Sequence, residues 1–90
     1  MTIQISKYGS LLVSRPAGHD AYLSAKAYLL NDSLDKIELD FSGVEVMTPS
    51  WLDEFLTPLK KEYGNKVELK FIENPTVQAS LATISASEGK

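Results

Sequence analysis

The sequence contains no cysteine and a single histidine, His19, among its 90 residues. These absences exclude a disulfide framework and a thiolate metal centre, and they leave zinc without its usual ligands. We therefore predict no metal site and no resident cofactor. His19 has no aspartate or serine at a spacing that specifies a catalytic triad, so we interpret it as a solvent-facing or capping residue and not as a catalytic base.

Arginine is equally scarce. Arg15 is the only one, the lysines are scattered, and the formal net charge is −3. Without a basic stripe to bind a phosphate backbone, the chain is not expected to bind nucleic acid directly. No apolar run approaches the roughly 18 residues that a membrane span requires, and the first residues lack the pattern of a signal peptide. We expect a cytoplasmic protein that does not associate with membranes.

Apolar residues, by contrast, are plentiful enough for one core. They make up 43% of the sequence, and 90 residues fit one small domain. Alternating apolar positions predict strands at 3–5, 11–13, 37–41 and 67–71, and helical spacing predicts helices at 17–29, 50–63 and 75–84. We expect one domain over residues 1–90, with 85–90 frayed.

The order of these elements, β-β-α-β-α-β-α, predicts an α/β fold with a four-stranded mixed sheet. A glycine-containing turn after Tyr8 indicates that the first two strands form an antiparallel hairpin, and helical crossovers make the remaining strands parallel. Charges at every second position of the last two strands predict one wet face, so all three helices should cover the other face. Pro58 predicts a bend or a break near Thr57 in the second helix.

Ligands usually bind an open parallel sheet where its strands end and the following helices begin. Three separate junctions of this kind place hydroxyls and the only guanidinium at one edge, which suggests an anion or phosphoryl site. The alternative is that these residues are ordinary loop polar groups and helix caps. Trp51 is either a binding anchor or, by its helical spacing, a core residue. The predicted binding edge consists of Arg15, Ser42, Gly43, Thr48, Pro49, Ser50, Trp51 and Asn74.

Residues 39–56 resemble the signature of the STAS domain of bacterial anti-sigma factor antagonists, in which a strand ending in Asp precedes a loop and a helix-opening Asp-Ser-Ser-Gly-Leu motif. They are more similar still to STAS-like domains of unknown function. The weaker first half of the likeness is Ser14, Arg15 and Gly18. The second half consists of Asp40, Phe41, Ser42, Gly43, Val44, Pro49, Ser50 and Leu52.

In STAS antagonists, the second serine of the motif is phosphorylated by an anti-sigma factor with a histidine-kinase-like ATPase fold, and this releases the complex. Ser50 corresponds to that serine, and Thr48 is the second choice. The chain departs from the motif around it, with Thr48 in place of Asp, Pro49 in place of the first Ser and Trp51 in place of Gly. The resemblance implies a partner that brings its own ATP and magnesium.

From these observations we expect a regulatory protein interaction module that is not an enzyme. Phosphorylation of Ser50 by a histidine-kinase-like ATPase or an anti-sigma-type regulator would switch it. The alternative is a domain that binds a nucleotide or phosphorylated metabolite at an edge formed by Arg15, Ser42 and Ser50. A third option is a structural module that pairs through an exposed sheet face or strand, with its serines serving only as caps. The sequence leaves the oligomeric state open.

Overall fold

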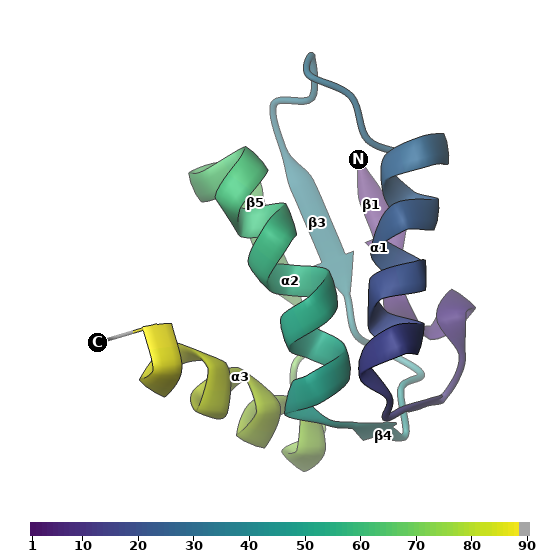
Figure 1. The fold of residues 1–90 in the computed structure, drawn as a ribbon, viewed down its shortest axis with the longest axis vertical. Helices are drawn as coiled ribbons and strands as arrows, with labels where there is room; N and C mark the ends of the chain where they lie inside the picture. Colours follow the sequence, from purple (N-terminus) through teal and green to yellow (C-terminus); the bar gives the residue numbers. More distant parts are fainter. Residues whose placement is uncertain (89–90) are drawn as a thin grey trace.

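The computed structural model describes residues 1–88, and over that range it is an α/β fold with five short strands (Figure 1). No helix in this range has the length and apolar character that crossing a membrane needs. The strands are β1 (Thr2–Gln4), β2 (Leu11–Leu12), β3 (Ile37–Asp40), β4 (Val46–Met47) and β5 (Val67–Lys70). The helices are α1 (Arg15–Tyr28), α2 (Pro49–Tyr63) and α3 (Pro75–Glu88), with short 3-10 turns at Ile5–Tyr8 and Gly64–Lys66.

The strands form two parallel sheets instead of one mixed sheet. One sheet has the order β1-β3-β5, and the other consists of β2 and β4. The predicted hairpin is therefore wrong. After β1 the chain turns into the Ile5–Tyr8 3-10 helix, which buries Ile5 completely, so β1 and β2 separate and pair with different strands.

Strand β4 is the element that the sequence did not predict. Its pairing with β2 begins where the backbone N–H groups of Glu45 and Val46 both donate to Ser10 O, at 2.9 and 3.0 Å. Just beyond its end, the N–H of Thr48 donates to Leu12 O at 3.0 Å. A strand of two residues is too short to show an alternating pattern, so the sequence carries no signal for it.

Helices α1 and α2 lie side by side in front of the three-stranded sheet (Figure 1), as predicted. Helix α3 differs, because it packs against β4 and α2. There Met47 N donates to the Thr76 hydroxyl at 3.0 Å, and the buried Ser80 hydroxyl donates to Met47 O at 3.2 Å. The side chain of Glu38, on the central strand, is partly exposed and pairs with neighbouring polar groups such as Thr2, as expected of a wet sheet face.

Pro58 does not break helix α2, which continues through it to Tyr63. A bend near Thr57 stays a prediction. Helix α3 extends to Glu88, while Gly89 and Lys90 lie outside the described residues.

The core lies between the sheet and helices α1 and α2. Trp51 and Phe55 stack with their ring centroids 5.3 Å apart, and Tyr8 packs against both rings. This aromatic cluster holds the start of α2 against the 3-10 helix at Ile5–Tyr8. The core consists of buried apolar side chains: Ile3, Ile5, Leu12, Ala21, Tyr22, Ala25, Ile37, Leu39, Phe41, Val44, Met47, Trp51, Leu52, Phe55, Leu56, Leu59, Tyr63, Val77 and Ile84.

Candidate functional site

The starts of α1 and α2 lie next to each other because the two strands that precede them are paired. Thr48, the N-cap of α2, donates its hydroxyl to Val13 O at 2.9 Å, just before the N-cap of α1 at Ser14. The predicted convergence of these two junctions is therefore present. It brings Arg15 and Ser50 to the same end of the molecule.

Gly18 allows α1 to approach α2 closely at this end. A Cβ atom built on Gly18 would lie 2.4 Å from the carbonyl oxygen of Trp51. Only a residue without a side chain fits against that backbone. This contact fixes how far α1 is shifted along α2. It thereby places Arg15, one turn before Gly18, next to the first turns of α2.

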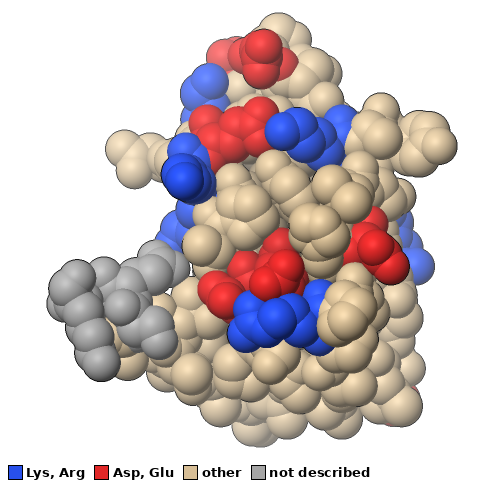
Figure 2. All heavy atoms as spheres, in the orientation of Figure 1, with Lys and Arg blue, Asp and Glu red and all other residues tan. Residues whose placement is uncertain are grey.

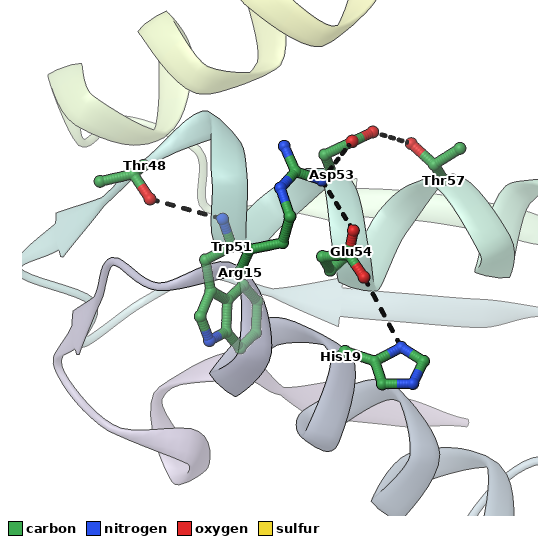
Figure 3. Close-up of polar contacts among 7 residues, drawn as sticks. All are labelled: Arg15, His19, Thr48, Trp51, Asp53, Glu54 and Thr57. Atoms are coloured by element: carbon green, nitrogen blue, oxygen red, sulfur yellow. Dashed lines mark hydrogen bonds and ion pairs between the residues drawn. The ribbon is translucent and has the colours of Figure 1, made fainter.

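Arg15 reaches across to α2 and binds two carboxylates (Figure 3). Its Nη1 donates to Asp53 Oδ2 at 2.9 Å and to Glu54 Oε2 at 2.7 Å. The Arg15 side chain is 50% exposed, and those of Asp53 and Glu54 are 40% and 28% exposed. Solvent screens such a pair strongly, so these bonds orient Arg15 more than they stabilise the fold.

Thr57 and His19 extend this polar cluster. Thr57 donates its hydroxyl to Asp53 Oδ1 at 2.6 Å, and His19 Nδ1 lies 3.6 Å from Glu54 Oε1 (Figure 3). Together with Tyr22 and Pro58, these side chains line an open groove of about 290 Å³ between α1 and α2. We define the acidic groove as His19, Tyr22, Asp53, Glu54, Thr57 and Pro58.

The electrostatics of the groove favour ionised Asp53. The hydrogen bond from Thr57, and then the hydrogen bond from Arg15, lower the pKa of Asp53 below its ordinary value of 3.8. The hydrogen bonds to Asp53 and Glu54 raise the pKa of the Arg15 guanidinium, which stays cationic. In Figure 2 the cluster is visible as red atoms directly above blue ones, in the lower half of the face.

Ser50 is half-buried and is the second residue of α2. Residues three and four positions apart share a helix face, so Ser50 lies one turn before both Asp53 and Glu54. Its hydroxyl forms no hydrogen bond with any residue that the structure describes. Ser50 is therefore not fully buried, and it lies on the same helix as the two carboxylates that bind Arg15. Its phosphorylation stays a prediction.

Thr48 and Trp51, in contrast, have structural roles. The Thr48 hydroxyl caps α2 by accepting from Trp51 N at 3.4 Å, in addition to its bond to Val13. Trp51 is only 1% exposed and belongs to the core, as its spacing also indicated. Its side chain therefore does not contribute to an exposed binding edge.

Ser42, Gly43 and Asn74, also predicted for the binding edge, make contacts within turns and at a helix cap. The Ser42 hydroxyl and N–H both donate to Asp40 Oδ1, at 2.6 and 2.8 Å, while Gly43 turns with a positive φ of 87° beside Ser6. Asn74 donates to the carbonyls that precede β4 and caps α3. These contacts are those of turns and caps.

The geometry gives little support to an anion pocket. Arg15 is already neutralised by two carboxylates, and Ser42 is bonded to Asp40 instead of facing Arg15. The hollow next to Arg15, of about 130 Å³, is lined in addition by Pro49, Asp53, Thr83 and Ile84, so it includes a carboxylate. Among the side chains of residues 1–86, no three metal-ligating groups lie together.

In a comparison with known protein families, residues 25–77 match the STAS-like domain of unknown function (DUF4325). The match covers more than half of the chain. The chain belongs to this family. No curated protein and no solved structure is significantly similar to it.

The STAS-like match confirms the family resemblance that the sequence suggested, and it includes Ser50 with its acidic neighbours Asp53 and Glu54. Arg15 and Gly18 lie before the matched range. Sequence reasoning named Arg15 but missed the two carboxylates that hold it. The spacing of Asp53 and Glu54, three and four residues after Ser50, indicated that they share its helix face. It could not indicate that Arg15 of α1 would contact them.

Proposed function

We propose that this STAS-like domain is a regulatory protein interaction module and not an enzyme, and that phosphorylation of Ser50 switches it. The contrast between the two hydroxyls at the start of α2 supports this proposal. Thr48 is engaged with Val13 and with the helix backbone, whereas Ser50 is partly exposed and its hydroxyl makes no hydrogen bond with residues 1–86. A kinase needs a hydroxyl that it can reach without disrupting a helix cap.

The expected kinase is the partner itself, a histidine-kinase-like ATPase or an anti-sigma-type regulator, which would supply ATP and magnesium. This part of the proposal comes from the STAS resemblance. The interaction surface would surround Ser50 at the start of α2. Phosphate there would not touch the core, so the fold would persist while the complex dissociates.

The charges around Ser50 indicate how the switch would act. A phosphoryl group adds about two negative charges, which the N-terminal dipole of α2 tolerates. Asp53 and Glu54, one turn further on, would repel it, whereas Arg15 would attract it. Phosphate would therefore compete with the two carboxylates for Arg15. The surface offered to an acidic or apolar partner would become distinctly more negative.

Mass spectrometry of the chain isolated from its own cells, with phosphatases inhibited, tests this proposal. We expect the mass of one added phosphoryl group and fragment ions that place it on Ser50. The Ser50→Ala variant should lack the added mass. Ser42→Ala, which alters an exposed serine in the loop after β3, should retain it. Phosphate on Ser42 or Thr48 instead of Ser50 would contradict the proposal, as would phosphate on Ser50 of a chain recovered in complex with its partner.

A further inference from the structure

Strand β5 forms one border of the three-stranded sheet. The strand order is β1-β3-β5, and within residues 1–88 no strand pairs with the side of β5 that faces away from β3. In Figure 1 β5 lies on the opposite side of β3 from β1. Residues 67–71 have the sequence Val-Glu-Leu-Lys-Phe. This segment is self-complementary about Leu69, because an acid precedes Leu69, a base follows it and an apolar residue stands at each end.

The hydrogen bond from Phe41 N–H to Lys70 O, at 3.0 Å, fixes the direction of the backbone groups of β5. A trans peptide directs its N–H away from its C=O, so the N–H of Phe71 points out of the sheet. Because successive peptide groups of a strand alternate, Val67 O, Leu69 O and Leu69 N–H point outward as well. The N–H of Val67 already donates to the preceding 3-10 turn. Four outward groups therefore remain on this edge: Val67 O, Leu69 N–H, Leu69 O and Phe71 N–H.

Antiparallel pairing of two copies about Leu69 would use all four of these groups. Leu69 would face Leu69 of the second copy, and the two residues would exchange both of their hydrogen bonds. Phe71 N–H would donate to Val67 O of the second copy, and the two-fold axis would repeat that bond. Phe71 has a positive φ of 57°, so the chain leaves the extended path directly afterwards and the pairing ends there. The outward groups thus match a second copy of the same strand.

The charged side chains of β5 fit the same register. Glu68 and Lys70 lie on the wet face, 41% and 45% exposed, and each would stand opposite the other on the second copy. Opposite charges directly across a sheet are favourable. Lys36 contacts one oxygen of Glu68 at 2.8 Å, whereas Lys70 Nζ lies 3.8 Å from Glu38, beyond hydrogen-bond distance. Lys70 can therefore donate to a carboxylate across the edge.

On the helix-covered face the same edge leaves apolar side chains partly uncovered. Val67 and Leu69 pack against the core but are not fully buried, whereas the residues that pair with them on β3 are. Phe71 is 58% exposed. Two copies would bring Leu69 against Leu69 and place Val67 opposite Phe71. Removal of this apolar surface from water would favour the pairing that the backbone groups and the charges specify.

We propose that β5 pairs antiparallel with β5 of a second copy of this chain, which joins the two three-stranded sheets into one. Charged residues usually protect an edge strand from such pairing. Here the charges attract, because a two-fold axis at Leu69 places acid opposite base, and a two-fold interface must be complementary to itself. The other border of the sheet lacks this feature, since β1 carries no charge. The inference is independent of the proposed role of Ser50.

Sedimentation velocity of the full chain over a range of concentrations tests this inference. We expect an equilibrium between monomer and dimer. Glu68→Lys and Lys70→Glu each place like charges opposite each other twice in the dimer, so each should weaken association about tenfold. An equimolar mixture of the two variants should restore association, because every facing pair then joins opposite charges. Gln4→Lys is the control, because it adds a charge to the exposed position of β1 and should leave dimerisation unchanged.

The mixture separates pairing from an effect on the fold, which circular dichroism of each variant checks. Mixing does not repair the ion pairs within either variant, so restored association must come from the interface. Amide exchange of the unmodified chain should show added protection of Leu69 and Phe71 as its concentration rises. The inference is wrong if the chain stays monomeric, if both single variants dimerise as tightly as the unmodified chain, or if the mixture associates no better than each variant alone. Ser50→Ala should dimerise normally.

Discussion

Replacing Gly18 with alanine should destabilise the protein, although glycine to alanine changes normally stabilise a helix. In an unhindered helix interior the change contributes about 1 kcal/mol of stability. Here the new Cβ would lie 2.4 Å from Trp51 O and 3.0 Å from Trp51 Cα. Both atoms belong to the backbone, so no side-chain rotation relieves the contact. Helices α1 and α2 would have to move apart at their closest point.

The expected loss of stability follows from the steric contact and from the gain in helix propensity. Overpacking a core costs about 1–3 kcal/mol or more, and a backbone contact of this kind belongs at the upper end. After the helix propensity gain is subtracted, Gly18→Ala should lower the free energy of unfolding by about 2 kcal/mol. For a chain of this size that corresponds to a fall in Tm of about 8–16 °C.

Thermal and urea unfolding, followed by circular dichroism, would measure the effect. Ala27→Gly is the control, because Ala27 is exposed on the same helix and reports helix propensity alone; in the last turn this should cost less than about 1 kcal/mol. A Gly18→Ala variant with a Tm equal to or above that of the unmodified chain would refute the close approach of α1 to α2. It would also remove the basis for placing Arg15 at Asp53.

Three further predictions concern the site and its surroundings. Thr57→Val and Arg15→Gln should each raise the pKa of Asp53 in an NMR titration, because each removes a hydrogen bond that lowers it. Since the folded pKa is lowered, ionised Asp53 stabilises the fold above pH 3.8, and this contribution is lost as the pH falls through the folded value. Asn74→Ala should lower the free energy of unfolding in urea by about 2 kcal/mol. Asn74→Asp keeps the helix cap and should lower it by about half as much. ATP at about 1 mM should leave Tm unchanged, since Arg15 is already paired; a clear rise would indicate a nucleotide site.

The elements that the sequence predicted well are those with long, regular patterns. The apolar stripe of α2 and the alternation of Ile37 and Leu39 in β3 survive in the structure because burial on one face determines them. The two-residue strand β4 and the turn at Ile5–Tyr8 were missed, since neither is long enough to show a period. That turn separates β1 from β2 and thereby changes the sheet.

The site was predictable in position but not in contacts. Pairing of β2 with β4 places Arg15 near the start of α2, as the junction argument required. Arg15 binds Asp53 and Glu54 only because α1 lies at a particular position along α2. Gly18 fixes that position through its contact with Trp51. Local spacing carries no information about such a contact.

We propose that phosphate on Ser50 separates this domain from its partner. A pull-down tests this with two forms of the full chain as bait in extract from its own cells, one with serine and one with phosphoserine at position 50. We expect the serine form to retain a histidine-kinase-like ATPase and the phosphoserine form to lose most of it. Equal retention of the ATPase by both forms, or tighter binding to the phosphoserine form, would rule out the proposed switch.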